Sequence, residues 1–130
     1  MGSVSDERVK ELLPEGLESA GAVNGGYEVL VRYQGWRAAV ITWAERFDRK
    51  NLYRLERHME TDEVFVLMAG EAVLYIGQEG TSVKMEPYRA YNVKCGIWHN
   101  ISVSSDAKVF ICENIDTGVE NTEYMEWSPE

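Results

Sequence analysis

The sequence predicts an all-β domain of the sandwich or barrel type. Three observations support this prediction: short apolar segments recur along most of the chain, polarity alternates within them, and Gly, Pro, Asn or Asp residues separate them. A length of 130 residues suits a single domain, and a hydrophobic fraction of 45% is enough to build a buried core. The alternation by itself does not choose between a sandwich and a barrel.

The chain begins with a segment of a different kind. Residues 5–13 predict a short helix that ends before Pro14. The apolar residues Val9, Leu12 and Leu13 lie on one side of this helix. A loop follows and closes with an Asn-Gly-Gly turn, after which the pattern changes to strands.

Nine strand-like segments follow, each bounded by turn residues. We therefore divide the chain into an N-terminal helix and loop (1–26), a barrel (27–116) and an acidic C-terminal tail that packs on the barrel (117–130). The predicted strands are 27–33, 36–43, 53–59, 63–68, 71–76, 81–85, 91–93, 101–103 and 108–114.

The surplus of acidic residues argues against some classes of partner. With 13 Lys and Arg against 22 Asp and Glu, the formal net charge is −9. Such a protein repels phosphate backbones and anionic lipids, so we expect neither nucleic acid nor a membrane as partner. The first residues lack an apolar signal core, which favours a cytoplasmic location. Cys95 and Cys112 are too few for a disulfide framework, and their apolar neighbours predict buried free thiols.

A polar cluster interrupts the apolar pattern in the middle of the chain. Side chains alternate faces along a strand, so Glu56 and His58 share one face of the segment 53–59. If Glu63 on the next strand also points inward, two carboxylates and an imidazole meet at the mouth of an apolar interior. Buried charge of this kind is costly unless it is paired or coordinates a metal. His99, the only other histidine, can complete a four-ligand set for Zn, Mn, Fe or Ni.

The spacing of these residues resembles the two sequence motifs of the cupins. His58, Glu63 and Gly70 are separated by four and then six residues, like the second histidine, the glutamate and the closing glycine of the first motif. Gly96 and His99 match the glycine and the histidine of the second motif.

The chain departs from the cupin motifs at three positions. Glu56 stands in place of the first histidine, Lys94 in place of a proline and Val103 in place of an asparagine. The resemblance implies a cupin-type jelly-roll barrel that commonly pairs as a homodimer. It also implies that the matched histidines and glutamate are three of the four usual metal ligands. A glutamate at the fourth position could still coordinate.

A narrower resemblance concerns the ureidoglycolate lyases, which are small cupin-like enzymes. The Glu-Arg-His run at 56–58, the aromatic run at 91–100 and the acidic close at 113–116 are similar to segments of those enzymes. The similarity covers roughly the second half of the chain. This chain differs in having Glu63, where those enzymes tend to lack a glutamate, and Asn100, where they have a second histidine.

Aromatic and cationic residues near the motifs are candidates for substrate contacts. Tyr53, Tyr91 and Trp98 could line a pocket, although aromatic residues in strands more often serve packing. Arg37 could hold the carboxylate or phosphate of a small anionic molecule, the alternative being an ordinary surface cation.

These features favour a metal-dependent enzyme that acts on a small polar or anionic metabolite by lyase or isomerase chemistry. A divalent ion held by His58, Glu63 and His99 would polarise an oxygen atom of the substrate, and Glu56 would move a proton. Two alternatives stay open. One is a non-catalytic cupin that binds a sugar or another metabolite, and the other is a metal-free enzyme similar to ureidoglycolate lyase.

Overall fold

The computed structural model describes residues 13–129. The predicted N-terminal helix over residues 5–13 falls almost entirely on residues 1–12, which lie outside the described range. Within that range the chain forms ten β-strands and three short 3₁₀ turns. They are β1 (Gly26–Tyr33), β2 (Trp36–Thr42), η1 (Glu45–Phe47), η2 (Arg49–Asn51), β3 (Arg54–His58), β4 (Glu63–Ala69), β5 (Ala72–Ile76), β6 (Thr81–Lys84), β7 (Ala90–Val93), β8 (His99–Val103), β9 (Lys108–Asn114), η3 (Val119–Asn121) and β10 (Thr122–Glu126).

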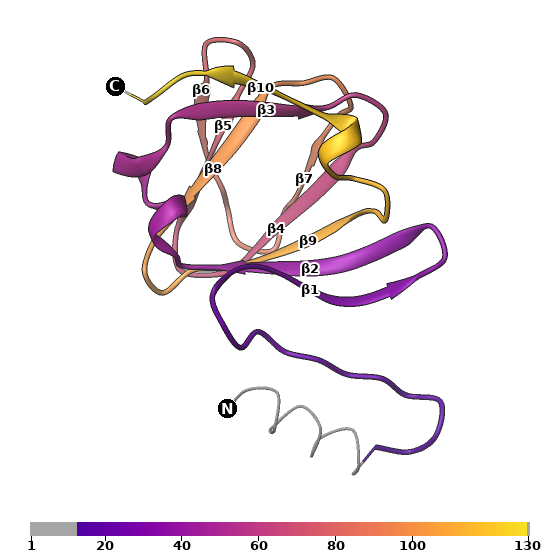
Figure 1. Ribbon diagram of the computed structural model, residues 1–130. Helices are drawn as coiled ribbons and strands as arrows, with labels where there is room; N and C mark the ends of the chain where they lie inside the picture. Colours follow the sequence, from indigo (N-terminus) through magenta and orange to yellow (C-terminus); the bar gives the residue numbers. More distant parts are fainter. Residues whose placement is uncertain (1–12, 130) are drawn as a thin grey trace.

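Two five-stranded antiparallel sheets face each other across the core (Figure 1). The first sheet has the strand order β1-β2-β9-β4-β7, and the second has the order β10-β3-β8-β5-β6. From β3 onward the chain passes repeatedly from one sheet to the other, so strands distant in sequence become neighbours. This confirms the predicted all-β class and brings β3, β4 and β8 together around one end of the interior.

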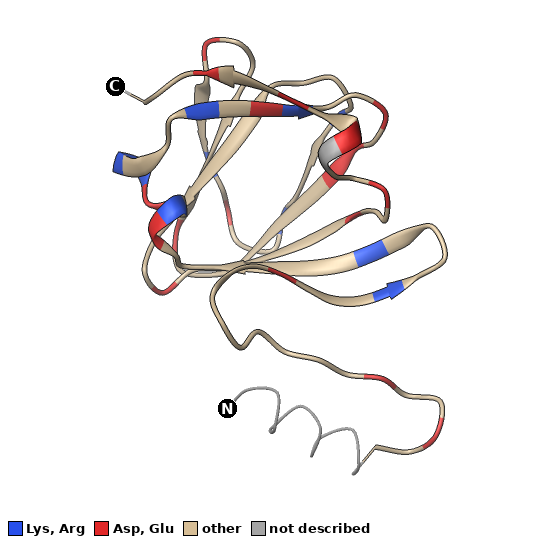
Figure 2. Ribbon diagram, viewed as in Figure 1, with Lys and Arg blue, Asp and Glu red and all other residues tan. Residues whose placement is uncertain are grey.

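Charged residues occur in the loops, in the 3₁₀ turns and in several strands (Figure 2). The strand β3, which crosses the upper part of the view, carries both acidic and basic residues. A strand that is charged on its inward face is unusual next to an apolar core, because buried charge is costly without a partner. The end of the barrel beside β3 is therefore polar, and the packing of an apolar core does not account for its charged residues.

The inward side chains change from apolar to polar along the two central strands of the first sheet. On β4, Leu67 and Phe65 belong to the buried core, and the next inward position is Glu63. On β9, Ile111 is followed in the same way by Glu113. Each large apolar side chain in the core stabilises the fold by about 1.5–3 kcal/mol. One end of the interior is thus an ordinary core, and the other end holds carboxylates.

The two faces of β3 have opposite surroundings. Leu55 is fully buried on the outer face, where it packs in a small cluster with Tyr75. Arg54, Glu56 and His58 line the cavity between the sheets. The predicted alternation on this strand is therefore confirmed, and it directs Arg54, Glu56 and His58 inward while Arg57 lies on the outer face.

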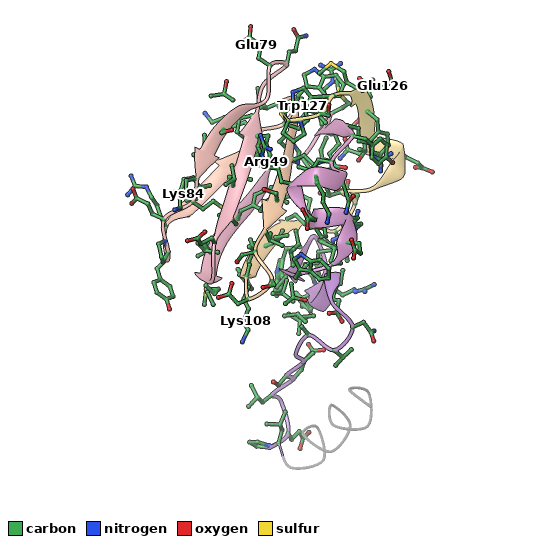
Figure 3. All side chains as sticks on the ribbon, turned by 90° about the vertical axis from the view of Figure 1, so that its left-hand side faces the viewer. Arg49, Glu79, Lys84, Lys108, Glu126 and Trp127 are labelled. Atoms are coloured by element: carbon green, nitrogen blue, oxygen red, sulfur yellow. The ribbon has the colours of Figure 1, made fainter. Side chains whose placement is uncertain are left out.

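The last strand, β10, was not among the predicted strands. It pairs with β3 in a register that places Thr122 opposite His58. Just beyond it lies Trp127, which is labelled together with Glu79 in Figure 3. The indole nitrogen of Trp127 donates a hydrogen bond to the carbonyl of Glu79 (3.3 Å), and the centre of its ring lies 5.3 Å from that of Tyr75. These contacts hold the C-terminal segment against the second sheet.

Two further expectations from the sequence need correction. β8 begins at His99, two residues before the predicted segment 101–103, so His99 is a strand residue paired with Glu56. Cys95 and Cys112 are free, as expected, but they are exposed and not buried. Cys112 lies on the outer face of β9, and Cys95 lies in the connection between β7 and β8. In the described part of the chain, no helix is long and apolar enough to cross a membrane.

Candidate metal centre

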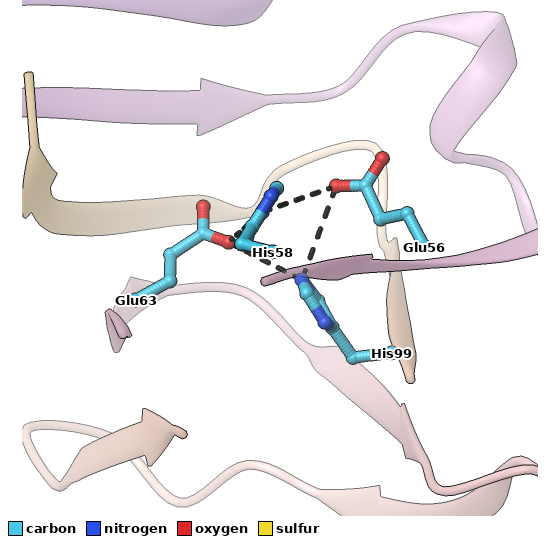
Figure 4. Close-up of side chains that lie close together, drawn as sticks. All are labelled: Glu56, His58, Glu63 and His99. Carbon is cyan, nitrogen blue, oxygen red and sulfur yellow. Dashed lines mark hydrogen bonds and ion pairs between the residues drawn. The ribbon is translucent and has the colours of Figure 1, made fainter. Parts of the chain in front are cut away.

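Four side chains from three strands converge at the polar end of the barrel (Figure 4). Glu56 and His58 come from β3, Glu63 from β4 and His99 from β8. Glu63 Oε1 lies 3.1 Å from His58 Nε2 and 3.2 Å from His99 Nε2. Glu56 Oε2 is slightly farther away, at 3.7 Å from His58 Nε2 and 3.9 Å from His99 Nε2. The fold thus brings together the four residues that the sequence singled out for metal binding and proton transfer.

This donor set fits a divalent transition metal. Imidazole nitrogen and carboxylate oxygen are common ligands of Zn, Mn, Fe and Ni. Neighbouring ligand atoms about 2.0–2.2 Å from a central ion lie about 2.8–3.6 Å from one another in tetrahedral or octahedral arrangements. The distances from Glu63 to both histidines fall in that range, and all four ligand atoms lie within 4.8 Å of one another. Glu56 could complete the set after a small movement.

Hydrogen bonds on the far side of each imidazole fix its orientation. His99 Nδ1 donates to the carbonyl of Ile97 (3.0 Å), and His58 Nδ1 donates to Thr122 Oγ1 (2.9 Å). The Thr122 hydroxyl in turn donates to the carbonyl of Gly118 (2.5 Å), so it accepts from the imidazole. With Nδ1 as the donor, Nε2 of each imidazole is the nitrogen that faces the cluster. Metal-binding histidines are commonly oriented by a hydrogen bond of this kind.

The charges of the cluster depend on one another. Burial alone would raise the pKa of Glu63, but hydrogen bonds to His58, His99 and Glu113 lower it, so Glu63 is a carboxylate. Burial alone would lower the pKa of His99, whereas the hydrogen bond and the charge of Glu63 raise it above its usual value. A positive charge between these atoms is therefore stabilised, whether protons or a metal cation supply it.

A second buried carboxylate, Glu113, stands beside Glu63 in the register of β4 and β9. Arg37 Nε donates to Glu113 Oε2 (2.7 Å), and the hydroxyl of Tyr27 donates to the same oxygen. Burial and the neighbouring Glu63 raise the pKa of Glu113 to about 7, although its bonds with Tyr27 and Arg37 oppose the shift. Glu113 and Tyr27 were not among the site residues predicted from the sequence. The available signal was alternation, because Glu113 follows Ile111 on the inward face of its strand.

The cluster opens into a cavity of about 340 Å³ between the sheets. The side chain of Glu56 is 34% exposed, whereas those of His58, Glu63 and His99 are 3–8% exposed. A molecule that enters the cavity therefore meets Glu56 before the other three residues. The strands β3, β8 and β10 and the turns η1 and η2 all contribute to the cavity wall.

Two of the four predicted substrate contacts line this cavity. Tyr53 does so with a side chain that is largely exposed to solvent. Arg37 also lines the cavity, but its guanidinium donates to Glu113 and to the carbonyls of Ile115 (3.3 Å) and Thr117 (2.5 Å). These three bonds occupy Arg37 within the protein, so its observed contacts are those of a residue that holds Glu113 in place.

The other two predicted contacts lie elsewhere. Tyr91 lines a separate apolar surface pocket, and its hydroxyl accepts a hydrogen bond from the backbone N–H of Glu86 (2.9 Å). Trp98 packs against the small apolar cluster of Leu55 and Tyr75 on the outer face of the second sheet. The Arg57 guanidinium lies 4.4 Å from the centre of its ring. Tyr91 stands opposite Phe65 on β7 and packs against the apolar core, away from the metal cluster. Trp98 precedes β8 and belongs to no strand, so period-two alternation does not apply to it.

Comparison with known proteins gives a likeness of structure without a likeness of sequence. Neither a protein-family model nor a curated protein sequence matches the chain. A Streptomyces Pac13 variant solved with uridine matches with a TM-score of 0.61 at 8% identity, over 85% of this chain and 88% of that one. Pac13 is described as a nucleoside dehydratase.

Two other solved structures extend the comparison. A cupin-2 domain protein from Shewanella frigidimarina matches with a TM-score of 0.50 at 14% identity, over 85% of this chain and 91% of that one. The Fe(II) form of HppE matches with a TM-score of 0.55 at 13% identity, over 79% of this chain and 62% of that one.

These identities are low enough that the likeness concerns the fold alone. The narrower resemblance to ureidoglycolate lyases stays a prediction, since no sequence comparison bears on it. Two observations identify the fold, namely the two facing antiparallel sheets and the solved neighbours, which include a cupin-2 domain protein. This chain has the cupin-type jelly-roll fold.

Proposed function

We propose that this protein is a metal-dependent enzyme that acts on a small polar or anionic molecule by lyase or isomerase chemistry. The observation that supports the proposal is the convergence of His58 Nε2, His99 Nε2 and Glu63 Oε1 beside a cavity of about 340 Å³. Three buried ligands with one accessible side are typical of catalytic metal sites, whereas structural sites are closed by four protein ligands.

His58, Glu63 and His99 would hold a divalent ion, and the chemistry that this ion would supply is Lewis acidity toward a carbonyl or hydroxyl oxygen of the substrate. Glu56 then has a distinct task, because it is the most exposed of the four residues and faces the cavity. A carboxylate in that position can remove a proton from the carbon next to a polarised oxygen and return it at another atom. Elimination and isomerisation both require such a base.

The structural neighbours support this class of chemistry. Pac13 is described as a dehydratase, which is an elimination enzyme, and HppE was solved with Fe(II). Pac13 is thus an example of the proposed class of reaction on a similar fold, and HppE is an example of the proposed kind of cofactor. Neither shares enough sequence with this protein to suggest its substrate.

Elemental analysis of the untagged, purified protein tests the metal centre. We expect about one equivalent of a transition metal in the wild type and its loss in His58→Ala and in His99→Ala. Glu71→Ala is the matched control, because Glu71 is an exposed carboxylate whose nearest cation, Lys84, lies 3.9 Å away. If no sample holds metal even after reconstitution, the proposal is wrong and the cavity is a pocket for an organic ligand.

A chelator test on an identified substrate separates the remaining alternatives. Turnover that stops when the metal is removed and returns when it is restored supports the metal-dependent enzyme. Turnover that continues in chelator contradicts it and favours the metal-free lyase, whereas ligand binding without any turnover favours the non-catalytic cupin.

A further inference from the structure

Three arginines line the cavity together with the candidate metal ligands. Arg37 is bound to Glu113 and to two backbone carbonyls, which leaves Arg46 and Arg54 to be considered. Arg54 lies on the inward face of β3, two residues before Glu56 and four before His58. Arg46 comes from the turn η1, between β2 and β3. Figure 2 shows the basic residues on this turn and on β3, at the same side of the barrel. The cavity of an acidic protein thus carries positive charge at some distance from the metal cluster.

The Arg54 guanidinium lies over two aromatic rings. Its guanidinium carbon lies 3.8 Å from the centre of the Tyr124 ring and 5.2 Å from that of the Tyr53 ring. Stacking of this kind uses the flat faces of the guanidinium and leaves its N–H donors free in the plane. Tyr53 and Tyr124 also line the cavity, so the stacked group is part of the cavity wall. The guanidinium is therefore oriented in advance of any ligand.

Neither Arg46 nor Arg54 forms an ion pair with a carboxylate in the described residues 13–129, unlike Arg37, which is paired with Glu113. Glu126 stands opposite Arg54 in the register of β3 and β10, yet the two form no ion pair. Arg57, on the outer face of the same strand, is paired with Glu123 at 2.7 Å. A shortage of acidic residues does not explain the difference, since the chain has 22 of them. The charges of Arg46 and Arg54 are available to an anion from outside.

We propose that Arg54, assisted by Arg46, binds the carboxylate of the substrate while the oxygen to be activated faces Glu56 and the metal cluster. This inference rests on the proposed function and names its substrate class, the small hydroxy- or keto-carboxylates. A planar guanidinium edge donates two parallel hydrogen bonds to a carboxylate. Two residues along a strand span about 7 Å, so the skeleton of a three- to six-carbon acid can bridge Arg54 and the cluster.

Calorimetric titration of the full-length, metal-reconstituted protein tests the inference. The carboxylate probes are malate, 2-oxoglutarate and gluconate, with sorbitol as the uncharged partner of gluconate and glycerol 3-phosphate as the phosphate probe. Each probe is titrated into the wild type, Arg54→Gln, Arg54→Lys and Arg57→Gln. Arg57→Gln is the matched control, because Arg57 belongs to the same strand but to its outer face. Chelation of metal by a probe in solution affects every variant alike and cancels in the ratio.

We expect at least one carboxylate to bind the wild type and Arg57→Gln equally well and sorbitol to bind much more weakly. Arg54→Gln should weaken carboxylate binding by about 10- to 100-fold, the usual effect of losing hydrogen bonds to a charged group. Arg54→Lys keeps the positive charge and loses the planar guanidinium, so its carboxylate affinity should lie between those of the wild type and Arg54→Gln. It also serves as the second test if the glutamine variant folds poorly.

The inference is overturned if no carboxylate probe binds the wild type, if Arg54→Gln and Arg54→Lys leave carboxylate affinity unchanged, or if glycerol 3-phosphate binds and the carboxylates do not. The metal content of each sample separates this failure from failure of the proposed function. A wild type that never holds metal refutes the metal centre, and the effect of Arg54 on carboxylate binding is then scored on the metal-free protein.

Discussion

Glu63 and Glu113 stand opposite each other on β4 and β9, close enough for their carboxyl groups to share a hydrogen bond. Both residues are buried, with exposed fractions of 6% and 5%. Two adjacent buried carboxylates cannot both ionise without a large cost. His58 and His99 favour the ionised form of Glu63, so the proton resides on Glu113, whose pKa is raised to about 7. Glu63 is thus the ionised candidate for a metal ligand, and Glu113 is the protonated carboxylic acid beside it.

The metal-free protein should lose stability as the pH rises from 5 to 8. Folding raises the pKa of Glu113 from 4.5 to about 7, so over this range the folded state retains a proton that the unfolded chain has released. The resulting stabilisation is complete below about pH 4.5 and disappears as the pH passes 7. Its size is at most about 3 kcal/mol, at about 1.4 kcal/mol per pKa unit. The raised pKa of His99 acts in the same direction. Urea unfolding at pH 5, 6, 7 and 8 measures the trend.

The variant Glu113→Gln assigns this trend to its source. Glutamine does not titrate, so the fall in the free energy of unfolding between pH 5 and 8 should become much smaller. Glu71→Gln, which changes an exposed carboxylate, should keep the slope of the wild type. A slope in Glu113→Gln equal to that of the wild type would mean that another group retains the proton.

Replacing Thr122 should weaken metal binding without touching a ligand. Thr122→Val removes the acceptor that orients His58 through its Nδ1 atom. Loss of such a partner usually costs 10- to 100-fold in metal affinity, and we expect about that loss here, with recovery in Thr122→Ser. Competition with a chromophoric chelator measures the affinity.

Thr117→Val is the matched control for Thr122→Val. The Thr117 hydroxyl donates its hydrogen bond to Thr61 (3.0 Å), so its partner is a threonine and not an imidazole. Its loss should lower stability and leave metal affinity unchanged. Equal losses of affinity in the two valine variants would show that general destabilisation, and not the orientation of His58, explains the effect.

Substitution of the two cluster glutamates should separate catalysis from metal binding. Glu63 is buried and lies near both imidazoles, so Glu63→Gln should lose the metal. Glu56 is farther from them and more exposed, so Glu56→Gln should retain most of the metal when the metal is supplied in excess. Its turnover should fall by about 10²- to 10⁴-fold, the usual contribution of a general base. If Glu56→Gln loses metal as completely as Glu63→Gln, Glu56 is an essential ligand and not a proton carrier.

The metal cluster could be predicted because three of its members satisfy a local rule and the fourth matches a motif. Glu56 and His58 share a strand face by alternation, and Glu63 is the first inward residue of a strand whose bounds the apolar pattern gave almost correctly. The motif spacing added His99, which no local rule could bring near the other three. Glu113 obeyed the same alternation but belonged to neither cupin motif, so nothing in the sequence connected it with Glu63 before the strand order was known.

The parts that could not be predicted depend on packing between distant segments. β10 reads Thr-Glu-Tyr-Met-Glu, and its acidic residues conceal a strand that forms only because β3 offers an edge. Arg54 shares the inward face with Glu56, but its stacking needs Tyr124 from that hidden strand. Tryptophan is a residue type that often lines pockets, and only the packing in the structure shows that Trp98 lies on the outer face of the second sheet.

The glycine that closes the first motif should be required for packing and not for metal binding. Gly70 has φ +71°, and a Cβ there would lie 2.6 Å from the backbone of Ala107. Gly70→Ala should therefore cost about 3 kcal/mol or more, since backbone strain and a clash with rigid main chain add together. Gly77 has φ +86° with nothing within 4 Å of the position that a methyl group would occupy, so Gly77→Ala should cost about 1–2 kcal/mol from the backbone strain alone. Urea unfolding measures both, and the difference isolates the clash with Ala107. Equal costs would mean that the positive φ is the whole reason for the motif glycine, whereas metal lost from folded Gly70→Ala protein would mean that the turn also positions the cluster.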